Sequence, residues 1–430
     1  MVSGKFTFFH GPTSNGNLHD NIMAQKKLIV IGGGAAGFFC AVNAARLNPK
    51  IEVVIVEKNN KILSKVRVSG GGRCNVTHSC FDIQELVKKY PRGQNFLKKS
   101  FHWFNTQHTI DWFEERGVTL ATEADGRMFP ITNTSQTIID CLMKETNKYG
   151  VRINYSTEII EIKKTDSVFE LLTNSNQVIQ ADFICIACGG YPKSTQFEWL
   201  QKIGHHIETP VPSLFTFNVP QHPILQLMGV SVESAHIKIT GTKLSNEGPL
   251  LITHWGFSGP AVLKLSAYAA RVLAEKNYDF TILINWIKNY NEHSLRDEWI
   301  HIREKFAAQK VHSKNPFQVP NRLWQFLLQL CEIQEQQRWA DITVKQQNQL
   351  IRLLTAHEFQ VKGKTTFKEE FVTCGGIQLS EVEANTMQSK KMQNLFFAGE
   401  ILDVDGITGG FNFQNAWTSG WLAAKSIAAL

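Results

Sequence analysis

Three glycines and an acidic residue near the start of the chain have the spacing of a dinucleotide-binding turn. Gly32, Gly34 and Gly37 form a GxGxxG motif after a short β-rich run, and Glu57 ends the next β-rich run. The first glycine permits a tight turn, the second lets the backbone approach a pyrophosphate, and the third allows close helix packing. Glu57 would accept hydrogen bonds from a ribose diol. Because an acid there disfavours a 2′-phosphate, the motif predicts FAD or NAD rather than NADP.

A second glycine-rich segment, Ser69 to Asn75 (SGGGRCN), is unsuited to a hydrophobic core. Three successive glycines bury no side chain and lose much backbone entropy, so they suit a place where backbone amides meet a ligand. A flavin edge and a phosphate are both candidates, and a flexible surface loop is the structural alternative. Arg73 would neutralise charge on a reduced flavin or a substrate. Cys74 is a candidate redox partner of the flavin, although we favour a small packing thiol.

A third motif lies near the C-terminus. A strand-like run at 394–398 precedes Gly399 and Glu400, and Gly410 precedes a helix expected from about 413 to 429. An acid at this position can hold the ribityl chain or the pyrophosphate, and a helix N-terminus can stabilise negative charge on a reduced flavin. A C-terminal segment that returns to the cofactor is needed for FAD, the longer molecule, and not for NAD.

The apolar pattern predicts the elements that must position these motifs. Residues 27–57 read as strand, turn, helix and strand, which is a βαβ unit of a doubly wound sheet. Residues 151–188 read as a β-meander that ends in a buried strand, and 191–285 remain β-like. Residues 286–356 have the spacing of three helices, in which a capping box is expected at Ser294.

Charge is concentrated in one segment. The chain has 430 residues, 45 Lys and Arg against 38 Asp and Glu, and a formal net charge of +7. Residues 58–103 carry ten basic residues against two acidic ones, so this segment accounts for the whole excess. It surrounds the SGGGRCN motif. The charge therefore predicts a local field for a pyrophosphate and an anionic substrate, and it disfavours a general nucleic-acid surface.

Other features exclude several classes of protein. Eight cysteines are scattered without paired spacing, which is typical of reduced thiols in a cytoplasmic protein. Cys185 and Cys188 form a CxxC within a buried strand, for which we favour a structural role. No stretch reaches the roughly 18 apolar residues of a membrane span once the glycine turn is discounted. Asp403 and Asp405 lack the other ligands of a calcium loop, so no metal site is expected.

Seven sequence blocks together resemble a known family. They are IGGGAAG (31–37), SGGGRCNVT (69–77), GRMFP (126–130), THWGFSGP (253–260), VTCGGIQLSEV (372–382), TMQSK (386–390) and FFAGEILDVDGITGGFNFQNAW (396–417). Over residues 25–430 the chain resembles the BaiN-type (YhiN-like) NAD(P)/FAD-dependent oxidoreductases, also labelled aminoacetone-oxidase-like FAD-binding proteins. The turn after Cys188 is shorter than in that family, which puts in doubt any ligand role of the missing residues.

The resemblance implies an α/β fold: a Rossmann-type FAD-binding domain built from both chain ends, with an inserted β-rich domain that carries a small three-helix subdomain. The expected divisions are a disordered extension (1–23), the FAD-binding domain (24–190 and 369–430), the β-rich domain (191–285 and 357–368) and the helical subdomain (286–356). The FAD contacts expected from the motifs and the resemblance are Gly32, Gly34, Ala36, Gly37, Glu57, Lys65, Ser69, Gly71, Arg73, Cys74, Asn75, Ile159, Gly399, Glu400, Gly410 and Asn412.

Two further residues are candidates for catalysis. Arg127 lies in GRMFP and His254 in THWGFSGP, both in loop-like segments. Reduction of a polarised C=C or C=O needs a hydride from flavin N5, a clamp for an oxyanion or carboxylate, and often a proton donor. We assign the clamp to Arg127 and the proton to His254. A salt-bridged arginine and a hydrogen-bonded structural histidine are the alternatives.

The sequence thus predicts a cytoplasmic FAD-dependent oxidoreductase that acts on a small organic substrate. Reduction of an activated double bond with NAD(P)H is the leading reaction, because one relative type reduces bile-acid enones. A flavin-dependent amine oxidase, a flavoprotein that binds or modifies RNA, and a non-catalytic FAD-binding protein are the alternatives. The chain has one GxGxxG motif, so NAD(P)H would bind transiently rather than in a domain of its own.

Overall fold

The computed structural model describes residues 25–166, 168–365 and 372–430, and the predicted extension over residues 1–23 lies outside this part of the chain. Its centre is a five-stranded parallel sheet in the order β20-β10-β1-β2-β6. Val30 in the middle strand pairs with Ile55 on one side and Cys185 on the other. The strands are β1 (Lys27–Ile31), β2 (Glu52–Val56), β6 (Arg152–Asn154), β10 (Phe183–Ile186) and β20 (Leu395–Phe397).

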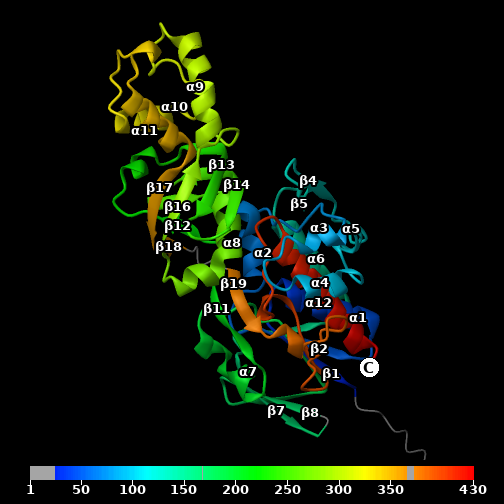
Figure 1. The fold of residues 1–430 in the computed structure, drawn as a ribbon. Helices are drawn as coiled ribbons and strands as arrows, with labels where there is room; N and C mark the ends of the chain where they lie inside the picture. The colour runs from blue at the N-terminus through cyan, green and yellow to red at the C-terminus, as the bar shows by residue number, and fades with distance from the viewer. Residues whose placement is uncertain (1–24, 167, 366–371) are drawn as a thin grey trace, which may run out of the picture.

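Both ends of the chain build this domain, as predicted. Strand β20, from the C-terminal part, completes the sheet beside β10, and α12 (Phe411–Ala428) lies along α1 (Ala35–Leu47) (Figure 1). A Cβ on Gly420 would lie 2.7 Å from the Ala36 carbonyl oxygen, so glycine is required for this close approach. The helices that surround the sheet are α2 (Ser64–Gly72), α3 (Ile83–Val87), α4 (Gln94–Phe101), α5 (Thr106–Glu114), α6 (Gln136–Lys148) and α7 (Glu198–Lys202).

Two small antiparallel sheets are attached to this domain. The predicted meander is present, but its first part forms β6 of the parallel sheet, so the meander lies between two parallel strands rather than before one. A three-stranded sheet beside the SGGGRCN segment has the order β3-β5-β4. The meander strands are β7 (Ile159–Thr165), β8 (Val168–Thr173) and β9 (Val178–Ala181), and the others are β3 (Thr77–His78), β4 (Leu120–Thr122) and β5 (Arg127–Pro130).

The inserted domain is a seven-stranded antiparallel sheet in the order β17-β16-β13-β14-β15-β12-β18. Helix α8 (Pro260–Glu275) packs on it, and three helices lie at the end of the molecule farthest from the meander (Figure 1). The strands are β12 (Thr216–Asn218), β13 (Ser231–Ile239), β14 (Ser245–Ile252), β15 (Gly256–Ser258), β16 (Asp279–Asn285), β17 (His357–Lys362) and β18 (Lys364–Thr365).

The three predicted helices are α9 (Glu292–Phe306), α10 (Asn321–Leu330) and α11 (Val344–Thr355). The capping box of α9 differs from the one expected. Asn291 is the N-cap, and its side-chain oxygen accepts from the Ser294 amide at 2.9 Å, while the Ser294 hydroxyl accepts from the Asn291 amide at 3.0 Å. Asn291 is therefore the N-cap, and Ser294 lies at the third helical position instead. Trp299 and Leu354 belong to the same hydrophobic core as the antiparallel sheet, so sheet and helices are stabilised together.

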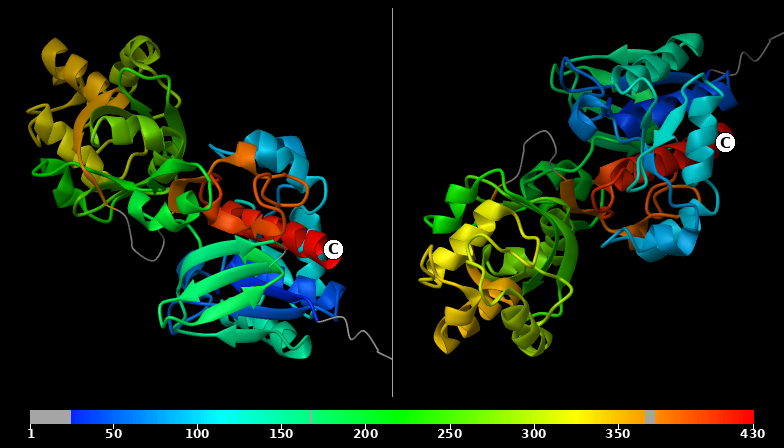
Figure 2. Two further views of the ribbon diagram at one scale, coloured as in Figure 1. Left: turned by 90° about the horizontal axis from the view of Figure 1, so that it is seen from below. Right: turned by 90° about the horizontal axis from the view of Figure 1, so that it is seen from above.

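An antiparallel pair joins the two domains: β11 (Ile207–Ser213) runs against β19 (Val372–Ile377). The two lobes and this connection are visible from two further directions in Figure 2. Phe197 belongs to the core of the FAD-binding domain and Phe215 to that of the inserted domain. We therefore propose that the boundary lies near residue 214 rather than at the expected 190. No helix in the described residues is both long and apolar enough to cross a membrane.

Candidate active site

One large cavity brings the sequence motifs together. It has a volume of about 1220 Å³, which exceeds the roughly 300–1,000 Å³ of common small-molecule sites. We call its two parts the dinucleotide end and the interdomain end. The dinucleotide end is lined by Gly32, Gly34, Glu57 and Ile159, and the interdomain end by His78, Lys89, Arg127 and Lys264.

Most of the predicted site residues lie on the wall of this cavity. Those that do are Gly32, Gly34, Ala36, Glu57, Lys65, Ser69, Asn75, Arg127, Ile159, Gly399, Glu400, Gly410 and Asn412. Gly37, Gly71, Arg73, Cys74 and His254 do not line it.

The turn after β1 has the geometry for which the glycines were predicted. Gly32 has φ +116°, and a Cβ there would lie 2.4 Å from the Ala187 carbonyl oxygen. Gly34 is the N-cap of α1 and a Cβ on it would meet no atom within 4 Å, so its backbone faces open space in the cavity. Gly37 is buried, and a Cβ on it would lie 2.0 Å from the Gly32 carbonyl oxygen. It therefore permits the tight turn without touching the cavity.

Two carboxylates fix the backbone around the dinucleotide end. Glu57 accepts hydrogen bonds from the Gly33 amide (2.8 Å) and from the backbone of Asn59 (2.9 Å). Glu400 accepts from the Thr373 amide at 2.8 Å and pairs with Lys65 at 2.5 Å. The Lys65–Glu400 pair joins the N-terminal and C-terminal parts of the chain across the cavity.

The SGGGRCN segment divides into residues that face the cavity and residues that do not. Helix α2 leaves helical geometry at Ser69, and Gly70 and Gly71 are left-handed with φ +59° and +70°. Ser69 and Asn75 line the cavity, and the side-chain amide of Asn75 lies 3.0 Å from the Gly410 nitrogen at the start of α12. The reversal of the backbone at the glycines thus aims one side of the segment at the N-terminus of α12.

Arg73 and Cys74 point away from the cavity. Arg73 pairs with Glu123 at 2.7 Å and lies over the ring of Phe129 at 4.0 Å. Its positive charge is therefore balanced by a carboxylate of the same domain. Cys74 is fully buried, and burial raises the pKa of its thiol to about 12. A thiol that stays protonated is a poor redox partner. The structure therefore favours the packing role for Cys74.

The two catalytic candidates differ in whether they line the cavity. Arg127 lines the cavity, but its guanidinium pairs with Asp125 (2.7 Å) and Glu123 (2.8 Å), so it is a salt-bridged arginine at the edge of the site. His254 is exposed, packs edge-on against Trp255 at 4.0 Å and is outside the cavity wall. The structure brings Arg127 to the site and does not bring His254 there.

A different histidine, which the sequence analysis missed, occupies the interdomain end. His78 stacks on Phe411 with ring centroids 4.7 Å apart, and its Nε2 lies 3.1 Å from the Asp125 carbonyl oxygen. Burial lowers the pKa of His78, which keeps the imidazole neutral near pH 7. The carbonyl therefore accepts from Nε2–H, and Nδ1 is a buried acceptor. His78 directly follows the SGGGRCNVT block, and that adjacency was the signal available in the sequence.

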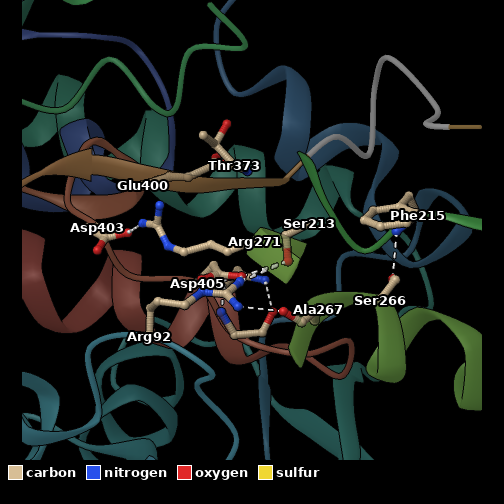
Figure 3. Close-up of polar contacts among 12 residues, drawn as sticks. Arg92, Ser213, Phe215, Ser266, Ala267, Arg271, Thr373, Glu400, Asp403 and Asp405 are labelled. Atoms are coloured by element: carbon tan, nitrogen blue, oxygen red, sulfur yellow. Dashed lines mark hydrogen bonds and ion pairs between the residues drawn. The ribbon is translucent and has the colours of Figure 1, made fainter. Parts of the chain in front are cut away.

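Helix α8 is the part of the inserted domain that contributes several residues to the cavity wall. Its first turn contributes Leu263 and Lys264 to the wall. Its middle is held by Arg92, which donates to the Ala267 carbonyl at 2.5 Å and forms a bidentate pair with Asp405 (Figure 3). Farther along the helix, Arg271 donates to Asp403 at 3.2 Å.

Asp405 is the buried centre of this anchor. It is completely buried and also accepts from the Ser213 hydroxyl at 2.7 Å (Figure 3). Burial raises the pKa of Asp405 to about 6, although Arg92 and Ser213 oppose the shift. Asp403 and Asp405 therefore connect the two domains, and the described residues contain no cluster of three or more metal-ligating side chains.

The cavity fits FAD by its size and by its unsatisfied polar groups. In the described part of the chain, His78 Nδ1 and Asn415 Oδ1 are buried without a hydrogen-bond partner, and both residues line the cavity. Buried polar atoms are normally paired, so such atoms along one cavity indicate a polar ligand. The N-termini of α1 and α12 both face the same space and suit negative charge.

A parallel sheet with a glycine-rich turn, completed by a C-terminal strand and helix, defines a dinucleotide-binding flavoprotein. The chain belongs to the HI0933-like family: the description "HI0933-like protein Rossmann domain" matches residues 26–426. The family comprises FAD-dependent oxidoreductases of the BaiN and YhiN type. This confirms the resemblance, the fold class and the assignment as an FAD-dependent oxidoreductase.

Similar proteins extend over nearly the whole chain. The chain is 29% identical over 416 residues to the ribosomal RNA dihydrouridine synthase of Escherichia coli, covering 95% of this chain and 99% of that protein. It is 26% identical over 413 residues to the 3-dehydro-bile acid delta(4,6)-reductase of Clostridium scindens, covering 94% and 99%. Among solved structures, the 3-ketosteroid delta1-dehydrogenase of Sterolibacterium denitrificans matches with a TM-score of 0.49 and 11% identity, covering 94% and 99%.

Proposed function

We propose that the protein is an FAD-dependent reductase that uses NAD(P)H to saturate a carbon–carbon double bond conjugated to a carbonyl group. The observation that carries this proposal is the single cavity that joins a dinucleotide end to an interdomain end. The names of both relatives support the reaction class, because forming dihydrouridine and reducing a 3-dehydro-bile acid each saturate such a bond. FAD, when bound, supplies the hydride chemistry by taking a hydride from the donor and delivering it to the substrate.

The dinucleotide end holds the cofactor in this proposal. The amides of the turn at Gly32 and Gly34 and the N-terminus of α1 bind the pyrophosphate, and Glu57 binds the ribose. Ile159 covers the adenine side. At the other part of the cavity, Ser69, Asn75 and the N-terminus of α12 contact the flavin ring. The remaining expected contacts on the wall are Ala36, Lys65, Gly399, Glu400, Gly410 and Asn412.

The interdomain end receives the donor and the substrate in turn. The sequence has one GxGxxG motif, so a second dinucleotide domain is not expected. The first turn of α8 and the segment around His78 border the space nearest to α12. These walls exclude water from a ligand that lies against the flavin, while the one proton that accompanies the hydride comes from solvent or a wall residue.

Two substrate classes are consistent with this reaction. A free small enone is the substrate that we expected from the sequence. A uridine in RNA is the second candidate, because two relatives named ribosomal RNA dihydrouridine synthase, from E. coli and Haemophilus influenzae, are matched over 99% and 98% of their lengths.

The test begins with the purified protein loaded with FAD. Anaerobic stopped-flow spectroscopy should show flavin reduction by NADH or NADPH, followed by reoxidation on addition of a 3-oxo-Δ4 steroid or of a uridine-containing RNA. The steroid and the RNA separate the two substrate classes. Rapid reduction by a primary amine, with none by either nicotinamide, would instead identify an amine oxidase. A protein that takes up no FAD would refute the proposal.

A further inference from the structure

Two lysines from different domains line the interdomain end. Lys89 comes from the segment between α3 and α4, and Lys264 comes from the first turn of α8 in the inserted domain; both are partly buried and line the cavity. Within the ranges that the structure describes, neither forms an ion pair. Arg127 in the same region pairs with two carboxylates.

Contacts across the domain interface place the two lysines close to each other. Tyr268, one helical turn after Lys264, donates its hydroxyl to the Lys88 carbonyl at 2.7 Å. The Lys89 carbonyl accepts from the Ile407 amide at 2.9 Å, which fixes this segment beside the loop that precedes α12. Both ammonium groups lower the pKa of His78, after the larger effect of burial. The three side chains therefore surround one region of the cavity.

The local balance of charge favours an anion. His78 is neutral, so it neither adds positive charge nor balances the positive charge of the lysines. Asp125, the wall acid whose charge acts on His78 as the two lysines do, pairs with Arg127 at 2.7 Å. Two ammonium groups in a cavity partly shielded from water repel each other more strongly than on an open surface. An oxyanion between them would relieve this repulsion and accept charge-assisted hydrogen bonds from both.

We propose that Lys89 and Lys264 together bind a phosphate group of the ligand that enters the interdomain end. The proposal rests on the proposed function for the identity of that ligand, and it makes the ligand a phosphate ester. The phosphate belongs either to the substrate, as in a nucleotide, or to the nicotinamide donor. Because the lysines come from different domains, the site is complete only when α8 lies against the FAD-binding domain.

The experiment measures phosphate binding without turnover. Protein loaded with FAD, so that its pyrophosphate site is filled, is equilibrated by dialysis with radiolabelled inorganic phosphate at constant ionic strength. The wild type should bind phosphate saturably. Lys89→Met and Lys264→Met should each weaken binding by about tenfold, as expected for loss of one charged hydrogen-bond donor. The double variant should bind none saturably.

Two controls separate charge from structural damage. Lys276→Met makes the same change at the exposed C-terminal end of α8, outside the cavity wall, and should bind like the wild type. Lys264→Arg keeps the charge and should retain binding. Absence of saturable binding in the wild type, or an equal loss in Lys276→Met, would overturn the proposal. Neither result depends on whether the protein reduces an enone, so this failure is distinct from failure of the proposed function.

A second measurement identifies the source of the phosphate. If the donor supplies it, Lys89→Met and Lys264→Met should slow anaerobic flavin reduction by NADH or NADPH. If those rates match the wild type, the phosphate belongs to the substrate. In that case the variants should lose the preference of the wild type for uridine 5′-monophosphate over uridine in titrations that follow the flavin spectrum.

Discussion

The two ends of the cavity are built in different ways. The dinucleotide end takes Gly32, Gly34 and Glu57 from one continuous βαβ unit, in which Glu57 accepts from the Gly33 amide. Glu400 joins them from the C-terminal part of the same domain. The interdomain end takes His78 and Lys89 from one stretch of the FAD-binding domain and Lys264 from the distant inserted domain. The first end is fixed by local folding, whereas the second exists only when two domains meet.

This difference suggests a division of labour. Binding a constant cofactor requires a fixed cradle, and a continuous βαβ unit supplies one. In the proposed function, the inserted domain contributes to the part of the cavity that receives the substrate. The Arg92–Asp405 anchor then matters for the second end, because it holds the helix that carries Lys264.

The largest expected effect on cofactor binding comes from filling the dinucleotide end. In Gly34→Leu the new Cβ would meet no protein atom within 4 Å, and the side chain would enter the cavity. We expect FAD affinity to fall by about 100-fold, because intrusion into a well-packed site costs about 3 kcal/mol, with an unchanged circular dichroism spectrum. The matched control is Gly71→Asn, which also faces open space but off the cavity, and asparagine tolerates its positive φ. Equal loss of FAD in both variants would contradict this assignment.

The largest expected effect on the free energy of unfolding concerns the anchor between the domains. Arg92→Leu leaves Asp405 buried without its ion partner, which should lower the free energy of unfolding at pH 8 by about 3–5 kcal/mol. Because the folded-state pKa of Asp405 is already raised to about 6, above 3.8, protonation favours the folded state. Loss of Arg92, which lowers this pKa, raises it further, so the variant should regain stability as the pH falls from 8 through 6 toward 3.8. Chemical denaturation at pH 5 and pH 8 measures this.

A second substitution checks the origin of that pH dependence. Adding Asp405→Asn to Arg92→Leu removes the titrating group, so the difference in the free energy of unfolding between pH 5 and pH 8 should shrink. If the difference persists, another group is responsible.

A smaller effect distinguishes the two catalytic candidates. Arg127→Ala should slow flavin reoxidation by the substrate about tenfold, because one charged group at the edge of the site is lost. His254→Ala should leave the rate unchanged, because this side chain is exposed and lies off the cavity wall. Stopped-flow spectroscopy compares the rates of flavin reoxidation in the two variants. A lower rate in His254→Ala would support His254 as the proton donor.

The smallest effect is expected at Cys74. Cys74→Ser keeps the size of a buried side chain whose thiol is protonated near pH 7, so the reoxidation rate should not change. The free energy of unfolding should fall by about 1 kcal/mol or more, because a hydroxyl is buried in place of a thiol. A large loss of rate without a loss of stability would indicate a redox role.

The sequence could place Gly32, Gly34 and Glu57 at one turn because the information for that turn is local. Glycine spacing, a following helix and an acid at the next strand end are constraints on one segment, and they are legible in order along the chain. The same logic located Glu400 and Gly410, since a strand and a helix directly flank them. The three helices of the inserted domain followed from their apolar spacing in the same way, although the N-cap of α9 was displaced to Asn291.

Only the tertiary structure decided which charged and titratable side chains reach the interdomain end. Arg73 and Arg127 have similar surroundings in sequence, but Arg73 turns onto Phe129 and Glu123 while Arg127 lines the cavity. Lys264 had no chemical signal of its own; it reaches the site because α8 packs against a domain assembled from both chain ends. Whether a side chain reaches a site across a domain interface depends on contacts between distant segments, and local residue patterns do not reveal those contacts.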